Sequence, residues 1–343
     1  MASNRQQRDE LRIKTTAIGV DLLPAISPDN VLALPRITRP DSISASFREV
    51  ARVIDAPTKV EGEGFQVRRP FPGAGLHSAD PFLLLDHWGA VEYAPGEAKG
   101  APWHPHRGFE TVTYVMDGAI RHRDSLGGGG LIADGATQWM TAGAGILHDE
   151  LPTEEIVTKG GLFHAVQLWV NLPRNLKWTP PRYQDVASRR VALLASHDGG
   201  AWLRLIAGEL DGHRGPGVTW TPITYAHATV TPGARLDLPW RSDFNALVYA
   251  LSGRGRAGAS GRPIQEGQLA EFGPGDALRI EADAEQDQRT PALDVLVLGG
   301  QPIREPAVFY GPFVMNTHEE IVQAIADYRA GRMGTIPAAT LAP

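Results

Sequence analysis

Two short segments of this 343-residue chain carry side chains that can bind a metal ion. The first has His104 and His106 on either side of a proline, and the second has His148 and Glu150. Residues two apart on a β-strand point to the same face, so each pair presents two donor groups together. If the two strands lie opposite each other inside a barrel, three imidazoles and one carboxylate converge. That donor set suits a divalent metal such as Fe(II), Mn, Ni, Cu or Zn, with iron among the best fits.

The same residues indicate a catalytic rather than a structural metal. Four protein ligands around an ion that prefers octahedral geometry leave up to two positions for water, dioxygen or a chelating substrate. Pro105 cannot donate a hydrogen bond to a central ladder, which places its segment at a strand end or edge, where a barrel mouth would lie. The chain has no cysteine, so nitrogen and oxygen atoms must hold any metal.

Other polar residues near these pairs allow more than one interpretation. Glu110 is four residues after His106. On a continuous strand its side chain would point to the same face, so Glu110 is a rival carboxylate ligand. His122 and Asp124 could orient a ligand by hydrogen bonding or could face solvent, and the solvent-facing interpretation is slightly favoured. Arg107 is interpreted as a cation at a pocket mouth or in a salt bridge, with a plain surface position as the alternative.

Large apolar residues close to the histidines are either ordinary core or the wall of a ligand pocket. Core is the safer interpretation for each one taken singly. These residues are Trp103, Phe109, Trp139 and Met140.

The elements that must position these residues are predicted to be β-strands. Short apolar runs are separated by turn residues, and the chain contains 38 Gly and 27 Pro. Many short strands with frequent turn signals predict an all-β sandwich or barrel, and the length is comfortable for two domains. The clearest runs are residues 82–85, 111–115, 166–170, 246–251 and 295–298.

A weak internal repeat suggests that the two domains are copies of one β unit. Residues 102–118 resemble residues 239–253, and residues 145–150 align with residues 276–281. In this alignment the second copy has no histidine at the ligand positions, so it is expected to be structural and free of metal. The residues at those positions are Arg241, Asp243, Arg279 and Glu281.

One helix is predicted near the end of the chain. Thr317 and Glu320 have the spacing of a capping box, and Ile321, Ile325 and Tyr328 form an apolar stripe. This stripe is expected to pack on the β core.

Charge and hydropathy argue against nucleic acid and membrane partners. The chain has 33 basic and 39 acidic residues, a formal net charge of −6, so a polyanion would not be attracted. The N-terminus mixes charges of both signs, and no stretch approaches the roughly 20 apolar residues of a membrane helix. A cytoplasmic protein is expected.

Several longer motifs resemble the pirin family of bicupins. The resemblance runs from about residue 50 to about residue 335 and keeps the motifs in the family's order. They are GEGF at 62–65, RRPFPG at 68–73, DPFLLLD at 80–86, HPHRGFETVTY at 104–114, QWMTAG at 138–143 and GPFVMNT at 311–317.

The resemblance implies two cupin-type barrels, each a double-stranded β-helix or jelly roll, packed face to face and accompanied by the C-terminal helix. It implies an N-terminal extension over residues 1–46, a metal-binding barrel over 47–185 and a metal-free barrel over 186–343. It also implies one iron ion in the first barrel and none in the second, and it places Glu110 outside the ligand set. The family's ligand positions fall on His104, His106, His148 and Glu150.

For function, the resemblance implies an oxidoreductase of the quercetin 2,3-dioxygenase type. Such an enzyme opens a flavonol with dioxygen and releases carbon monoxide, so its partners are a small aromatic substrate and O2. We expect Glu150 to act as the general base that takes the substrate's hydroxyl proton. The alternative is a non-enzymatic, iron-dependent regulatory protein that binds a transcription factor or a metabolic enzyme.

Overall fold

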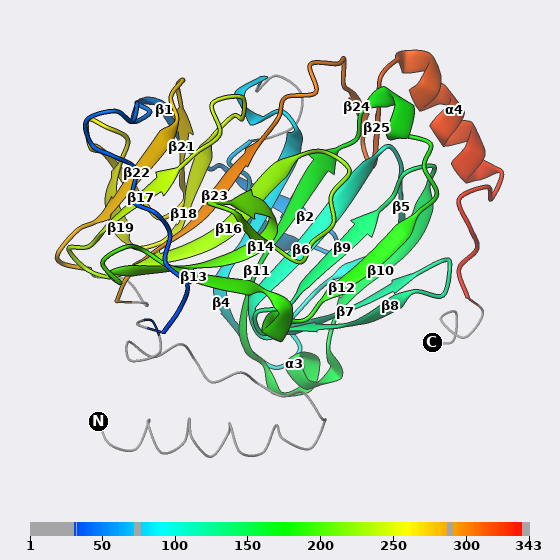
Figure 1. Ribbon diagram of the computed structural model, residues 1–343. Helices are drawn as coiled ribbons and strands as arrows, with labels where there is room; N and C mark the ends of the chain where they lie inside the picture. The colour runs from blue at the N-terminus through cyan, green and yellow to red at the C-terminus, as the bar shows by residue number, and fades with distance from the viewer. Residues whose placement is uncertain (1–30, 32, 72–76, 287–290, 338–343) are drawn as a thin grey trace. The chain divides into compact units, whose positions relative to one another are not determined.

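The first barrel of this computed structural model consists of two facing antiparallel sheets (Figure 1). The structure describes residues 31, 33–71, 77–286 and 291–337. The strands of the first barrel are β2 (Thr58–Glu61), β3 (Phe65–Arg68), β4 (Phe82–Tyr93), β5 (Ala101–His106), β6 (Phe109–Asp117), β7 (Ala119–Asp124), β8 (Gly129–Ala133), β9 (Thr137–Thr141), β10 (Ile146–Pro152), β11 (Gly161–Asn171) and β12 (Arg182–Val186). Seven of them form a sheet in the order β12-β9-β6-β11-β4-β3-β2, and four form a sheet in the order β5-β10-β7-β8. Trp88, Ile120, Ile132 and Phe163 pack between the two sheets.

The second barrel repeats this arrangement. Its strands are β1 (Val50–Asp55), β13 (Ala192–Ala195), β14 (Ala201–Leu210), β15 (His213–Arg214), β16 (Ile223–Val230), β17 (Arg235–Pro239), β18 (Leu247–Ser252), β19 (Arg254–Ala257), β20 (Arg262–Gln265), β21 (Gln268–Phe272), β22 (Ala277–Ala282) and β23 (Leu293–Gly300). The larger sheet has the order β1-β21-β18-β23-β16-β14-β13 with β15 beside β14, and the smaller has the order β17-β22-β19-β20. The smaller sheets of the two barrels thus have equivalent pairing orders, which confirms two copies of one unit. Each apolar run predicted from the sequence lies within a strand or within one residue of it.

The two larger sheets pack on each other through an apolar layer, which confirms the face-to-face arrangement. This layer includes Val112, Leu168, Leu247 and Leu296, two from each barrel. Two histidine–tyrosine pairs cross it. His87 Nδ1 lies 3.0 Å from Tyr249 Oη, and His227 Nδ1 lies 2.9 Å from Tyr114 Oη, so each barrel supplies one histidine and one tyrosine.

Strand β1 precedes the first barrel in sequence but pairs with β21 of the second. Of the predicted N-terminal extension, only Val31 and residues 33–46 are described. Residues 34–46 lie along the second barrel, where Arg36 forms a parallel bridge with Ala195 and the Thr38 N–H donates to Asp211 at 2.6 Å. The domain boundaries at residues 46 and 185 stay a prediction.

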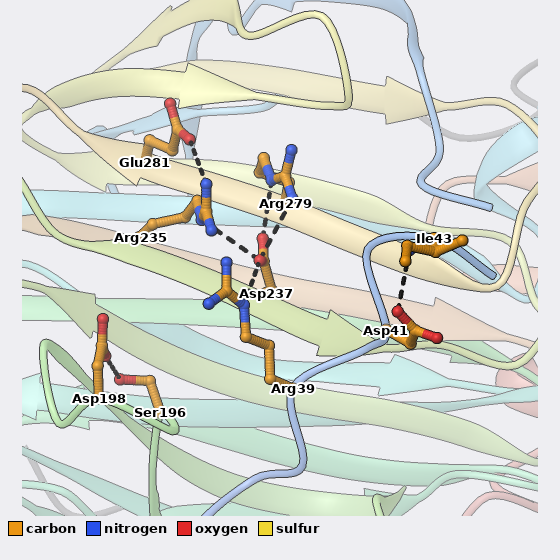
Figure 2. A network of polar contacts seen from close by, with 9 residues as sticks. All are labelled: Arg39, Asp41, Ile43, Ser196, Asp198, Arg235, Asp237, Arg279 and Glu281. Atoms are coloured by element: carbon orange, nitrogen blue, oxygen red, sulfur yellow. Dashed lines mark hydrogen bonds and ion pairs between the residues drawn. The ribbon is translucent and has the colours of Figure 1, made fainter. Parts of the chain in front are cut away.

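The repeat alignment made from the sequence was wrong in register. It placed Arg279 at an inward-facing ligand position, whereas Leu278 and Ile280 point into the core of the second barrel. Arg279 instead donates to Asp237 at 2.8 Å on the outer face, in the network with Arg39 that Figure 2 shows. A slip of one residue moves a whole strand to the opposite face, and short Pro-rich matches do not fix the register that closely.

Arg241 and Asp243, which the same alignment also placed at ligand positions, lie beyond the end of β17. They form an exposed ion pair with each other at 2.7 Å. The inward positions of β17 and β22 carry Leu236, Leu238 and Leu278, side chains without a metal-binding atom.

The C-terminal helix is α4 (His318–Arg329), which follows a short hairpin of β24 (Val308–Tyr310) and β25 (Phe313–Met315) (Figure 1). The predicted capping box between Thr317 and Glu320 is confirmed. The apolar stripe was expected to pack on the β core; Ile321 packs on the hairpin, and Tyr328 is 43% exposed. The buried polar residue of the last turn is Asp327.

The other helical segments with described bounds are short. They are η2 (His77–Ala79), α3 (Glu154–Lys159), η3 (Arg174–Leu176) and η4 (Ser188–Arg190). Within the residues that the structure describes, no helix is long and apolar enough to cross a bilayer.

Candidate metal centre

The pairing of β5 with β10 brings the predicted histidines together. The two strands run antiparallel, with His104 directly opposite His148 and His106 opposite Ile146. The register shifts after His148, so a bulge separates it from Glu150. Both strands belong to the smaller sheet of the first barrel, and their inward faces therefore share one interior.

The rings of His104, His106 and His148 form a tight cluster. Their centroids are 4.7, 4.3 and 4.8 Å apart, and one donor nitrogen from each ring lies within 4.8 Å of the others. His106 and His148 are buried, whereas His104 is half-buried. The cluster therefore meets solvent on the side of His104.

Hydrogen bonds to backbone carbonyls fix the tautomers of two of these rings. His104 Nδ1 donates to the Pro102 carbonyl at 2.8 Å, and His106 Nδ1 donates to the Pro312 carbonyl at 3.3 Å. Each Nε2 then carries a lone pair, and the two Nε2 atoms are only 3.1 Å apart. Two facing lone pairs at this distance suit a shared cation, and an imidazole held through its other nitrogen is the usual metal ligand.

Burial keeps the imidazoles of His106 and His148 neutral. It lowers the pKa of His106 and of His148 well below the ordinary histidine value, and the neighbouring His104 lowers both further. Metal ligation requires the neutral ring. His106 and His148 are therefore in the form that binds metal at neutral pH.

Glu150 lies next to His148 but is not gathered with all three histidines. Its carboxylate accepts hydrogen bonds from Gln167 Nε2 at 2.9 and 2.8 Å and from Thr113 Oγ1 at 2.9 Å. A carboxylate oxygen of Glu150 and donor nitrogens of His148 and His122 lie within 4.8 Å of one another. The structure thus distributes the four predicted ligands over two groups that share His148.

The slightly favoured expectation that His122 and Asp124 face solvent was wrong. Both side chains are buried, because β7 lies between β10 and β8 and turns every second residue inward. The His122 ring lies 4.9 Å from the ring of His148. Asp124 accepts the backbone N–H groups of Leu126 and Gly128, so it stabilises the turn that follows β7.

Glu110 does not belong to the cluster. The chain turns at Gly108, where φ is +91°, so the even spacing between His106 and Glu110 no longer puts both side chains on one face. Glu110 and Thr113 point to opposite faces of β6, and Glu110 accepts from Thr141 Oγ1 at 2.6 Å on the far side. Burial raises the pKa of Glu110 to about 7.

Arg107 forms a buried salt bridge. Its guanidinium donates to Asp327 of α4 at 2.6 Å and to the Ala144 carbonyl at 2.6 Å, and it stacks on Trp178. Only 3% of Arg107 is exposed, so the surface alternative was wrong. The arginine joins the segment after His106 to the C-terminal helix.

Of the apolar residues singled out in the sequence, Phe109 lies against the cluster. Its ring centroid is 5.1 Å from that of His106 and 4.3 Å from that of Trp169. Met140 packs in a small buried group with Ile146, and Trp139 belongs to the layer between the barrels. Trp139 is thus ordinary core.

The sequence reasoning missed Gln167, which holds Glu150. Gln167 stands in the middle of the apolar strand β11, whose alternate residues Val166 and Leu168 pack between the barrels. A polar side chain at an otherwise apolar strand position was a usable signal, because burial of an amide requires a hydrogen-bond partner.

A pocket inside the first barrel is lined in part by Glu150. Its walls are largely apolar, with Lys99 as a second charged lining residue. The aromatic side chains are Phe65, Trp88, Tyr93 and Phe163. Apolar walls with a few polar residues are a common composition for a small-molecule site.

Comparison with known families matches both barrels. The Pirin family model matches residues 64–170, and the model of the Pirin C-terminal cupin domain matches residues 225–334. Together these matches cover more than half of the chain.

Individual relatives agree with these matches. A Pseudomonas aeruginosa protein with the provisional name quercetin 2,3-dioxygenase is 41% identical over 274 residues, which cover 79% of this chain and 93% of the relative. A pirin-like protein of Solanum lycopersicum is 38% identical over 294 residues, covering 85% of this chain and 95% of the relative. A crystal structure of quercetin 2,3-dioxygenase from Acinetobacter baumannii is similar with a TM-score of 0.78 and 36% identity, covering 85% of this chain and 100% of that chain.

Proposed function

Because this chain belongs to the pirin family, we propose that it is a metal-dependent dioxygenase that opens flavonols such as quercetin with O2. The names of the Pseudomonas and Acinetobacter relatives support this substrate class. We propose iron(II) as the ion, with His104, His106, His148 and Glu150 as its ligands. Three imidazoles and a carboxylate form a donor set that iron binds well.

The observation that carries the proposal is the arrangement of the lone pairs. Backbone carbonyls hold the Nδ1 atoms of His104 and His106, and their Nε2 atoms face each other at 3.1 Å. A satisfied core histidine would instead use both nitrogens in hydrogen bonds. Neither ring nitrogen of the buried His148 has such a bond among the described residues.

A bound metal would supply Lewis-acid and redox chemistry at this point. The protein's own contribution is to bind and deprotonate the substrate. Glu150 takes the hydroxyl proton of the flavonol, since this residue lines the pocket and its carboxylate lies near His148. Gln167 and Thr113 hold the carboxylate oxygens, which fixes the position at which the proton is accepted.

The pocket supports an aromatic substrate. Phe65, Trp88 and Phe163 provide apolar walls that exclude water and favour a flat ring. Phe109 and Trp169 cover His106 on another side of the cluster. The substrate would thus be held between apolar surfaces with its hydroxyl group toward Glu150.

The proposal is tested by comparing protein stripped of metal, reloaded with iron, and carrying His148→Ala. We expect the iron-loaded protein to convert quercetin and release carbon monoxide, and the other two samples to lose both metal and turnover. His227→Gln, a change at a buried histidine of the second barrel, is the matched control and should keep both. Full turnover by the metal-free samples would overturn the proposal. Absence of turnover with a panel of flavonols, together with a reproducible protein partner, would favour the regulatory alternative.

A further inference from the structure

A second pocket lies on the outer face of the second barrel, where the segment of residues 34–46 meets β17 (Figure 2). Its volume is about 50 Å³, whereas a single water needs about 10–15 Å³, so the pocket has room for a group of several heavy atoms. No step of the proposed function uses it. The lining residues are Arg39, Ser196, His197, Asp198, Arg235 and Asp237.

Three arginines converge on one buried carboxylate in this pocket. The side chain of Asp237 is only 4% exposed, and Figure 2 shows the three guanidinium groups approaching it from different sides. Arg279 donates two hydrogen bonds to Asp237, at 2.8 and 3.3 Å. Arg39 Nε and Arg235 Nε lie farther away, at 3.4 and 3.3 Å. Asp237 is therefore paired with Arg279 and still holds two further cations beside the pocket.

Arg39 and Arg235 keep hydrogen-bond donors that the protein does not use. Among the described residues neither guanidinium donates a hydrogen bond; Arg39 contacts only Asp237, and Arg235 contacts Asp237 and, at 3.9 Å, Glu281. An arginine that served only to fasten residues 34–46 to the barrel would donate directly, as Arg36 does to the Ser196 carbonyl at 2.8 Å. The Arg39 and Arg235 side chains are 48% and 38% exposed, so a ligand from solvent can reach their free donors.

The charges around the pocket favour an anion. Asp198 is the carboxylate that could oppose one, but its Oδ1 accepts from Ser196 Oγ at 2.7 Å and from the Gly200 N–H at 2.9 Å, which commits that oxygen to its own turn. The residues that line the pocket or contact its lining supply four guanidinium groups against three carboxylates. The arginines are Arg36, Arg39, Arg235 and Arg279, and the acids are Asp198, Asp237 and Glu281.

We propose that this pocket binds a phosphate group, with Arg39 and Arg235 as its donors and with Asp237 and Arg279 as the pair that positions them. A guanidinium presents its N–H groups as a planar fork that matches two oxygens of a phosphate, and such charge-assisted hydrogen bonds are strong. Arg39 precedes the first barrel in the sequence, whereas Arg235 belongs to β17. The bound group would therefore also join residues 34–46 to the second barrel.

Sulfate is the first probe, because it has the shape and charge of a phosphate group and is a weaker ligand for iron. Calorimetric titration of the full-length, iron-loaded protein at constant ionic strength should show saturable binding of one sulfate. Arg39→Gln and Arg235→Gln should each weaken it by roughly tenfold or more, because each removes charge-assisted hydrogen bonds. Arg39→Lys keeps the charge but not the planar fork, so its affinity should fall between that of the wild type and that of Arg39→Gln.

Arg241→Gln is the matched control. It removes the same charge from an exposed arginine of the same barrel, one that pairs with Asp243, and should bind sulfate as the wild type does. No saturable heat with the wild type overturns the proposal, as does equal affinity of Arg39→Gln, Arg235→Gln and Arg241→Gln. If Arg235→Gln fails to fold, the two substitutions of the half-exposed Arg39 decide the outcome by themselves.

The source of the phosphate group is identified by repeating the titration with inorganic phosphate and with glycerol 3-phosphate. The difference between the wild type and Arg39→Gln removes any heat that comes from phosphate at the iron. Tighter binding of the ester than of phosphate assigns the pocket to a phosphorylated metabolite, and equal or weaker binding assigns it to the free oxyanion. Loss of both signals in Arg39→Gln is expected in either case, and their persistence contradicts the proposal.

Discussion

Gln167 donates from one amide nitrogen to both carboxylate oxygens of Glu150, at 2.9 and 2.8 Å. The amide comes from β11 in the larger sheet and the carboxylate from β10 in the smaller one, so the contact spans the barrel interior. Gln167 Oε1 in turn accepts from Trp169 Nε1 at 3.1 Å. This chain of contacts fixes the amide, and the amide fixes the proposed base.

Gln167→Leu should therefore lower activity while the histidine cluster stays intact. Loss of a partner that orients a ligand typically costs about 10–100-fold in activity or metal affinity. Thr113→Val, which removes one of the hydrogen bonds to Glu150, should cost less. Steady-state flavonol turnover over a range of pH checks the expectation, because a displaced base also shifts the pH profile. Equal kinetics and equal profiles for wild type and Gln167→Leu would contradict it.

Glu110→Gln should change how stability depends on pH. Burial raises the pKa of Glu110 from 4.5 to about 7, so the folded protein binds the proton more tightly than the unfolded chain. The resulting stabilisation is fully present below about pH 4.5 and is lost as the pH rises through about 7. It amounts to about 3 kcal/mol.

Urea unfolding between pH 5 and pH 8 measures this effect. The free energy of unfolding of the wild type should fall more steeply with rising pH than that of Glu110→Gln, which keeps the shape and cannot ionise. Glu97→Gln, at an exposed position, is the control and should follow the wild type. Parallel curves for wild type and Glu110→Gln would show that Glu110 has an ordinary pKa.

Arg107→Met should destabilise the protein far more than Arg332→Met, although both arginines contact Asp327. Arg107 is buried, and its removal leaves Asp327 with a buried oxygen unpaired, at a cost of roughly 3 kcal/mol. The Arg332 side chain is 56% exposed, and an exposed ion pair contributes less than about 1 kcal/mol. Chemical denaturation of both variants provides the measurement; similar losses would mean that burial of the Arg107 pair is unimportant.

Gly108→Ala should be severely destabilising because of what a side chain would meet. A Cβ at Gly108 would lie 2.0 Å from the Val314 carbonyl, whereas one at Gly127, which also has positive φ, would meet nothing within 4 Å. Gly127→Ala therefore shows the backbone strain alone, about 1–2 kcal/mol. Gly108→Ala adds the displacement of β25, and we expect a loss of roughly 3 kcal/mol or more. Equal melting temperatures for the two variants would contradict this account.

The alternation of side chains along a strand was sufficient to predict that His104, His106 and His148 lie together. The two-residue spacings of His104 with His106 and of His148 with Glu150 survive because each pair lies on one strand or across one bulge. The same rule gave the wrong direction for Glu110, because the chain turns at Gly108 between two strands. The even spacing from His106 therefore does not put Glu110 on the same face. Spacing along the chain gives a side chain's direction only within one element.

Contacts between distant segments were not available from the sequence. The burial of His122 depends on β7 lying between two strands, and the partner of Arg107 comes from a helix 220 residues later. The register of the second barrel also depends on packing, since Leu278 and not Arg279 points inward. In each case the local sequence pattern allows both the predicted and the observed arrangement, and contacts with distant segments decide between them.

Oxygen uptake by the iron-loaded protein in the presence of quercetin tests the central claim most directly. The account predicts that wild-type protein consumes one O2 for each quercetin opened and that His104→Ala, prepared identically, neither retains iron nor consumes O2. Uptake that persists in a folded His104→Ala variant depleted of iron would contradict it.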